Sequence, residues 1–184
     1  MSIQARRERE RAEREKLIVT AARELVETEG WDAVTTRRLA EEVEYSQPVL
    51  YSHFKGKDAI MAAVALEGFA DLATELRAAA PSGLAAVATA YTSFAERRPA
   101  LYDAMFSQAV DLPFASPATP AALHAGFDAL SDAIRPHVGD DDLGLLTETF
   151  WAALHGLATL TRGGRLPRDA HDERLTILLS RFTT

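Results

Sequence analysis

Apolar residues recur along this chain at the three- and four-residue spacing of an α-helix, and the alternating pattern of a strand is nearly absent. The first helix is expected at about residues 5–29, with Ile18, Ala22 and Leu25 on one face and Gly30 at its end. The pattern predicts an all-α fold of about nine helices. The others are expected at about residues 37–43, after Ser46, and at about 57–79, 84–96, 99–106, 121–134, 143–161 and 168–182.

Residues 34–57 carry the most specific local pattern. They read as two short helices joined by a tight turn, with polar and aromatic side chains on the second helix. Thr36 is suited to cap the first helix and Ser46 the second. Pro48 is tolerated in the first turn, because N–H groups there have no partner within the helix. This pattern predicts a helix-turn-helix, whose second helix lies in the major groove of DNA.

The charge distribution gives this interpretation weak support. The net charge of −7 alone argues against a polyanionic partner. Residues 1–57, however, hold 11 Lys/Arg and 11 Asp/Glu, whereas residues 58–184 hold 9 and 16. The basic residues are thus relatively concentrated in the part of the chain that contains the helix-turn-helix.

Arginine and glutamate alternate between residues 6 and 16. One interpretation is a solvated extension of the first helix, held by ion pairs four residues apart. The other is an arm that touches the DNA backbone or the minor groove. The sequence leaves both open.

Several function classes lack the residues that they need. The chain has no cysteine, which excludes a thiolate zinc site and a cysteine nucleophile and fits a reducing cytoplasm. The histidines show no metal-ligand spacing, and nucleotide-binding and nucleophile-elbow motifs are absent. The charged N-terminus does not read as a signal peptide, and no apolar run is long enough to cross a membrane. We therefore expect a cytoplasmic protein that is not an enzyme and has no metal, cofactor or membrane partner.

The N-terminal third resembles the TetR family of bacterial transcriptional repressors. The match lies in Thr-Thr-Arg at 35–37, Gln-Pro-x-Leu-Tyr-x-His at 47–53, the Tyr-x-x-Phe at 51–54, and Lys57 before a long helix. Residues 34–57 are closest to the DNA-reading module of the tetracycline repressors. The sequence from Trp151 to Gly156 also resembles the Trp-His-Gly type of C-terminal domain found in some members.

The resemblance implies DNA contacts for nine residues. Four would read bases: Arg37 a guanine edge, Gln47 an adenine, and Pro48 and Val49 a thymine methyl group. The remaining five would lie at the backbone or make a weaker contact. Thr36, Tyr51, His53 and Lys57 would hold phosphates, and Ser52 replaces a larger aromatic residue.

One departure from the family lies in the turn between the two short helices. The family usually has glycine where this chain has Glu44. Glutamate in a left-handed conformation costs about 1 kcal/mol or more. This predicts a strained or rearranged turn, and it adds a negative charge close to DNA.

The rest of the chain, residues 58–184, is expected to bind an effector and to form a homodimer, with residues 1–57 as the DNA-binding domain. In this family the helical core usually holds a small inducer, and deep apolar pockets are common binding sites. The helix at 143–161 is apolar on too many faces for a monomer, so we expect it to form the interface together with the helix at 168–182. The candidate pocket residues are Phe69, Leu72, Tyr91, Phe94, Leu101, Met105, Phe106, Phe127, Trp151 and His155.

Together these features predict a ligand-responsive regulator. It would be a homodimeric repressor that binds a palindromic operator on double-stranded DNA and is released by a small-molecule inducer. One alternative is a constitutive DNA-binding dimer without a small-molecule ligand. The other is a helical-bundle enzyme, which the missing catalytic motifs disfavour.

Overall fold

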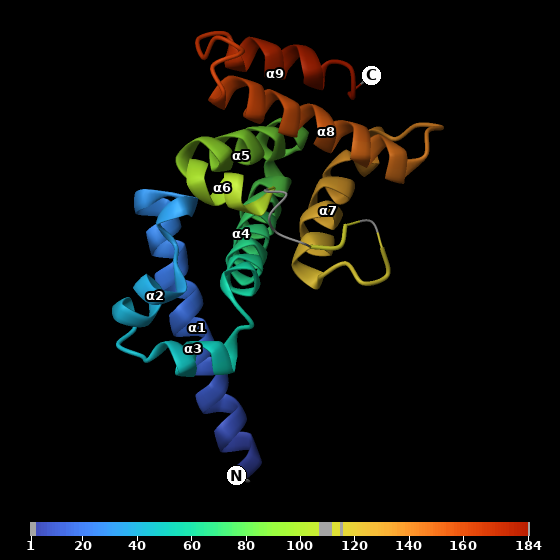
Figure 1. Ribbon diagram of the computed structural model, residues 1–184. Coiled ribbons are helices and arrows are strands. Elements are labelled where there is room, and N and C mark those ends of the chain that lie inside the picture. Colours follow the sequence, from blue (N-terminus) through green and yellow to red (C-terminus); the bar gives the residue numbers. More distant parts are fainter. Residues whose placement is uncertain (1–2, 107–111, 115, 184) are drawn as a thin grey trace. The chain divides into compact units, whose positions relative to one another are not determined.

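A computed structural model describes residues 3–106, 112–114 and 116–183 (Figure 1). Within these residues the predicted all-α fold is confirmed, with nine α-helices, three short 3-10 helices and no strand. The first four helices are α1 (Ile3–Glu29), α2 (Thr36–Glu42), α3 (Gln47–His53) and α4 (Lys57–Ala79). The others are α5 (Leu84–Arg97), α6 (Pro99–Met105), α7 (Ala121–Ile134), α8 (Leu143–Arg162) and α9 (His171–Leu179). The 3-10 helices are η1 (Trp31–Ala33), η2 (Ala80–Ser82) and η3 (Arg135–His137).

Most helices lie where the apolar spacing predicts them, and the differences are at their ends. The proline-rich stretch before α7 holds no helix in residues 112–114 and 116–120, while residues 111 and 115 lie outside the described part. The prediction of a helix at 168–182 was too long at both ends. Arg168 to Ala170 form a turn in which the Asp169 carboxylate accepts the Ala170 N–H at 3.0 Å.

The predicted cap of α2 was wrong by one residue. Thr35, not Thr36, has the extended backbone of a helix cap, with φ −129° and ψ 151°. Its hydroxyl oxygen accepts the Arg38 backbone N–H at 3.1 Å. Thr36 is therefore the first residue of the helix, and its hydroxyl is not used as a cap. Ser46 does stand at the cap of α3, but through its carbonyl rather than its side chain.

The chain divides into two compact units, Met1–Gly68 with Ala100–Pro113, and Phe69–Pro99 with Phe114–Thr184. We call them unit 1 and unit 2. Helix α4 begins in unit 1 and continues into unit 2. The predicted division at residues 57 and 58 concerns function rather than compactness, and it stays a prediction.

Unit 1 is built on the apolar face of α1. Ile18 of that face is fully buried, as are Leu39 of α2, Leu50 of α3 and Ile60 of α4. This small core fixes α2 and α3 on one side of α1. The close contact between α4 and α6 depends on Gly68, where an added Cβ would lie 2.8 Å from Cγ of the buried Met105.

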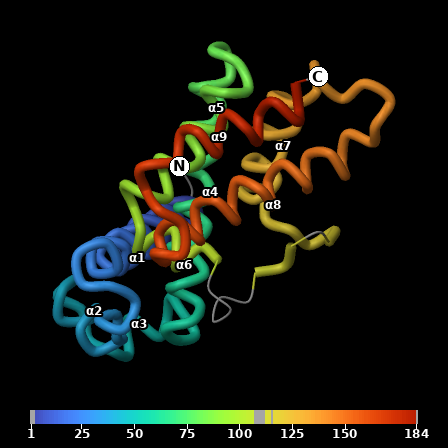
Figure 2. The backbone as a smooth tube through the Cα atoms, turned by 90° about the horizontal axis from the view of Figure 1, so that it is seen from above, coloured from blue at the N-terminus to red at the C-terminus, as the bar shows by residue number. Residues whose placement is uncertain are grey.

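Unit 2 is built around α8. The Asp142 carboxylate caps this helix by accepting the Leu145 N–H at 2.9 Å. One face of α8 packs against α5 and α7, and α9 lies beside both α5 and α8 (Figure 2). The buried positions of α8 recur at three and four residues, so they form a single stripe. They are Thr147, Phe150, Leu154, Ala158 and Thr161.

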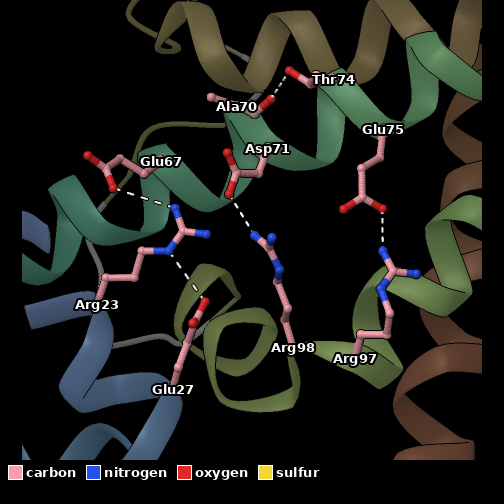
Figure 3. A network of polar contacts seen from close by, with 9 residues as sticks. All are labelled: Arg23, Glu27, Glu67, Ala70, Asp71, Thr74, Glu75, Arg97 and Arg98. Carbon is pink, nitrogen blue, oxygen red and sulfur yellow. Dashed lines mark hydrogen bonds and ion pairs between the residues drawn. The ribbon is translucent and has the colours of Figure 1, made fainter.

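Ion pairs hold α4 within each unit (Figure 3). In unit 1, Arg23 of α1 lies between Glu27 and Glu67, with its Nη1 3.6 Å from Oε2 of Glu67. In unit 2, Arg98 donates to Asp71 at 2.7 Å and Arg97 donates to Glu75. These pairs are partly exposed, so each contributes to orientation more than to stability.

Candidate nucleic-acid interface

The turn between α2 and α3 keeps the left-handed conformation in spite of Glu44. Glu44 has φ 55° and is the one non-glycine residue with positive φ in the part of the chain that the structure describes. The Tyr45 N–H donates to the Ala40 carbonyl at 2.8 Å, and the Glu44 N–H donates to the Glu41 carbonyl at 3.3 Å. These two bonds form the helix ending in which glycine is usual. The turn is therefore strained rather than rearranged.

Helix α3 buries Leu50 and presents residues 47–49, 51 and 52 outward. Leu50 is fully buried, whereas Val49 and Tyr51 are 37% and 51% exposed. Five of the residues that the family resemblance assigns to DNA lie on this exposed surface. They are Gln47, Pro48, Val49, Tyr51 and Ser52.

The two neighbouring arginines of α2 have different environments. Arg37 leaves 79% of its side chain exposed and pairs with Glu41 at 3.0 Å. Arg38 donates through both terminal nitrogens to the carboxylate of Glu29, which joins α2 to α1. This hydrogen bond also holds the pKa of Glu29 below its usual value. Arg37 is therefore available to a ligand, whereas Arg38 positions the helix.

Thr36 joins the exposed surface of α3. Its hydroxyl lies 3.4 Å from the Tyr51 hydroxyl, so the first residue of α2 and the middle of α3 are adjacent. Thr36, Arg37 and the exposed residues of α3 thus form one continuous polar surface of unit 1. We call these seven residues the α3 surface.

Two of the predicted phosphate contacts, His53 and Lys57, do not belong to the α3 surface. His53 leaves only 6% of its side chain exposed, and its Nδ1 lies 3.4 Å from Oε1 of Glu15 in α1. Lys57 donates to the Trp31 carbonyl at 3.1 Å and lies over the Trp31 ring. The sequence pattern could not reveal either contact, because the partners are 38 and 26 residues away in the chain.

The predicted pocket residues fall into both units. Leu101, Met105 and Phe106 belong to unit 1, where the Tyr102 and Phe106 rings are in contact. The other seven belong to unit 2, where Phe69, Leu72, Tyr91 and Phe94 are buried and Phe127, Trp151 and His155 are partly exposed.

An aromatic cluster forms within unit 2 around Trp151. The indole N–H donates to the Tyr91 hydroxyl at 3.0 Å. The Phe114 ring stacks on Trp151, with centroids 6.5 Å apart, and meets the edge of Phe69 at 5.8 Å. The set of predicted pocket residues missed Phe114, because a proline-rich segment predicts a loop and gives no helical spacing to follow.

His155 borders this cluster, with its ring centroid 6.5 Å from that of Trp151. Burial lowers the pKa of its imidazole, and the nearby Arg162 lowers it further. The imidazole is therefore neutral at neutral pH and can both donate and accept a hydrogen bond.

The described residues contain no group of three or more His, Asp or Glu that could hold a metal ion. Nor is any helix in this part of the chain long and apolar enough to cross a membrane.

Two family matches decide the relationship. Residues 84–182, more than half of the chain, match the family described as "Tetracyclin repressor-like, C-terminal domain". Residues 18–64 match "Bacterial regulatory proteins, tetR family". The chain belongs to the TetR family.

Individual relatives agree with this membership. The uncharacterized HTH-type transcriptional regulator YobS of Bacillus subtilis is 34% identical over 97 residues, 49% of this chain and 50% of that protein. The class C tetracycline repressor of Escherichia coli is 49% identical over 53 residues, 29% of this chain and 24% of that protein. The matches thus span half the length of the first relative and less of the second.

Among solved structures, a protein of unknown function from Rhodococcus sp. RHA1 is 28% identical, with a TM-score of 0.75. The alignment covers 91% of this chain and 92% of that chain. The fold shared with that protein therefore extends through nearly the whole chain, beyond the short region that resembles the tetracycline repressors.

Proposed function

We propose that this TetR-family protein is a DNA-binding transcriptional repressor that acts as a homodimer on a palindromic operator and is released by a small-molecule inducer. The observation that carries the proposal is the α3 surface. A buried Leu50 and a completed turn at Glu44 hold this surface, which exposes groups suited to base edges and phosphates.

In this proposal each residue of the α3 surface has a chemical task. Arg37 reads a guanine edge and Gln47 an adenine, because their planar groups can form two parallel hydrogen bonds. Pro48 and Val49 contact a thymine methyl group. Thr36 and Tyr51 hold phosphates as an adjacent pair of hydroxyls, and Ser52 makes a smaller contact.

The environments of His53 and Lys57 change their proposed roles. His53 positions α3 against α1 rather than binding a phosphate directly, because its side chain is buried against Glu15. Lys57 uses one of its three N–H donors on Trp31, and its remaining donors serve a phosphate at the start of α4.

Homodimer formation through α8 and α9 is supported by the outward side of α8. Opposite the buried stripe, α8 carries mostly small or apolar residues, with Leu145 65% and Leu160 38% exposed, and with Glu148 and Thr159 exposed at the edge of this side. A helix that is apolar on two opposite sides needs a second partner. We call this side the α8 surface, and it consists of Leu145, Thr149, Ala152, Gly156 and Leu160. On α9, Ile177 is 61% exposed and extends the apolar area.

The proposed inducer site involves the aromatic cluster of unit 2. Tyr91, Trp151 and the neutral His155 combine large apolar area with a few polar groups, as small-molecule sites usually do. Phe69, Leu72, Phe94 and Phe127 are proposed as further apolar lining. The candidate residues Leu101, Met105 and Phe106 belong to unit 1 and are not part of this cluster. The dimer would have one state with high DNA affinity and one with low DNA affinity. An inducer would release DNA only to the extent that it binds the low-affinity state more tightly than the high-affinity state.

A constitutive DNA-binding dimer without a ligand is the alternative that remains testable. The enzyme alternative has little support, because the sequence carries no known catalytic motif and the described residues offer no group of three or more His, Asp or Glu that could hold a metal ion. We also propose the cytoplasm as the place of action, since a regulator of bacterial genes meets its DNA there.

The proposal can be tested by selecting genomic fragments with the purified full-length protein at moderate salt. We expect enrichment of a palindromic site bound by two protomers, which sedimentation of the complex would count. A small molecule that raises the melting temperature and releases this site would support the inducer. Stabilising ligands that leave DNA bound would favour the constitutive dimer, and no enrichment above background would contradict the proposal.

A further inference from the structure

The first turns of α1 precede the part of the chain that matches the N-terminal family model. That match begins at residue 18, whereas α1 begins at Ile3. Fifteen residues of helix therefore precede the matched region. They are exposed or half-buried and contribute nothing to the apolar core of unit 1. Isolated helices of this length are only marginally stable in water, and apolar packing does not stabilise this segment. The helical conformation of the segment therefore needs another explanation.

This extension is held against the end of α3. Nη2 of Arg11 lies 3.4 Å from the Ser52 carbonyl oxygen, and Oε1 of Glu15 lies 3.4 Å from Nδ1 of His53. Arg11 and Glu15 also pair with each other at 2.8 Å. These contacts fix the direction of the extension relative to the helix that reads DNA in the proposed function.

The extension continues beyond this contact. In Figure 1, α1 runs past α3, and its N-terminal turns project beyond that helix. From Arg11 to Ile3 the helix rises about 12 Å. The major groove is about 8.5 Å deep, so a projection of this length next to α3 is long enough to reach the backbone of a duplex bound there.

The charges of the extension are sorted by face. Arg7, Arg11 and Arg14 follow the same stripe as the buried Ile18, at spacings of four, three and four residues. No acidic residue falls on this stripe. Glu10 and Glu15 flank it, and each pairs with an arginine, Arg6 and Arg11 respectively. Arg6 and Arg9 lie on the opposite side of the helix.

We propose that the basic stripe Arg7, Arg11 and Arg14 binds phosphates of duplex DNA beside the site read by α3. This inference rests on the proposed function and extends its DNA surface to a segment that precedes the matched family region. The stripe is proposed to contact phosphates and not base edges, so it adds affinity and salt dependence rather than sequence preference.

The test compares two full-length variants that lose the same charge from opposite faces, R7Q/R14Q and R6Q/R9Q. The probe is a fluorescently labelled duplex of mixed sequence, titrated from about 50 to 200 mM salt, so no operator needs to be known. We expect R7Q/R14Q to lower the slope of log affinity against log salt by about 0.9 for each lost phosphate contact, which is about 1.8 per protomer and about 3.6 for a dimer with both protomers on the duplex. We expect R6Q/R9Q to keep the wild-type slope. Circular dichroism checks that both variants keep the helix.

An unchanged slope in R7Q/R14Q would overturn the inference, and so would an equal fall in both variants. Failure of the proposed function gives a different result, because the wild-type protein would then not bind the duplex even at low salt. If the wild-type protein binds and Arg37→Gln weakens binding while R7Q/R14Q does not, the α3 surface stands and the basic stripe does not.

Discussion

The α3 surface and the α8 surface are both exposed sides of helices whose other side is buried, yet their chemistry differs. On the α3 surface the exposed groups are an amide, hydroxyls and a guanidinium, with Val49 as a small apolar contact. On the α8 surface they are mostly small or aliphatic. Both helices bury one side in a core, so the residues on the exposed side are the ones that indicate the partner. The first suits a hydrated, charged duplex and the second a second copy of the chain.

The largest effect is expected from a charge on the α8 surface. Ala152→Glu places a carboxylate in the middle of the proposed interface, where it would be buried without a partner. We expect a monomer. We also expect DNA affinity to fall by about 100-fold or more, because two linked protomers would no longer bind the two half-sites of the operator at once. Analytical ultracentrifugation and DNA titration measure both.

Ala121→Glu is the matched control, since it makes the same substitution at an exposed position in the first turn of α7. It should leave the dimer and its DNA affinity intact. An Ala152→Glu protein that is still dimeric would show that the α8 surface is not the interface.

A smaller and more local effect is expected from Arg37→Gln on the α3 surface. Losing a bidentate contact should cost about 1–3 kcal/mol of discrimination at a single base pair of each half-site. Binding to a panel of single-base operator variants would reveal the position. Arg165→Gln removes the same charge from an exposed site in unit 2 and should leave all base preferences unchanged. Equal behaviour of the two variants would count against base reading by Arg37.

Glu44→Gly tests whether the turn before α3 stores strain. Glycine accepts φ 55° without a steric penalty, so we expect the free energy of unfolding to rise by about 1 kcal/mol. Chemical denaturation followed by circular dichroism measures this change. Glu44→Gln removes the charge and keeps the strain, so it should not reproduce the gain. A gain in both variants would mean that charge repulsion, rather than backbone strain, destabilises the turn.

The smallest effect concerns His155 and pH. Burial holds its pKa in the folded protein below the usual 6.5, so the unfolded chain takes up the proton first as the pH falls. Its stabilising contribution is present above pH 6.5 and is lost as the pH falls through the lower pKa of the folded state. His155→Gln should therefore lose less stability than the wild-type protein between neutral pH and about pH 5. The melting temperature of both proteins is measured at each pH across this range. An equal fall in melting temperature for the wild-type protein and His155→Gln would contradict the lowered pKa of His155.

The sequence predicted the helices because they depend on local apolar spacing, whereas the residues assigned to DNA came from the resemblance to the TetR family and their role stays a prediction. Apolar residues at three and four positions define α1 and α8, and Leu50 alone decides which side of α3 is exposed. Sequence could not choose between Thr35 and Thr36 as the cap, because either hydroxyl is suitable and only the backbone conformation distinguishes them.

Long-range contacts account for the other differences. His53 lies inward because of Glu15, on the part of α1 that precedes the matched family region. Glu44 keeps the left-handed turn because two hydrogen bonds and the packing of Leu39 and Leu50 oppose a rearrangement. Phe114 joins the aromatic cluster from a loop, where no periodic pattern exists. In each case the structure depends on a contact with a residue that is distant in the sequence, or on a backbone conformation that the residue type alone does not specify.

The most direct test of the account is the base preference of α3 itself. Fragment selection with wild-type protein and with Gln47→Ala, under the same salt conditions, compares the two preferences position by position. The account predicts a palindromic site in which the mutant relaxes the preference for one adenine in each half-site and keeps the remaining positions. An unchanged preference at every position would contradict it, because the α3 surface would then not be the element that reads DNA.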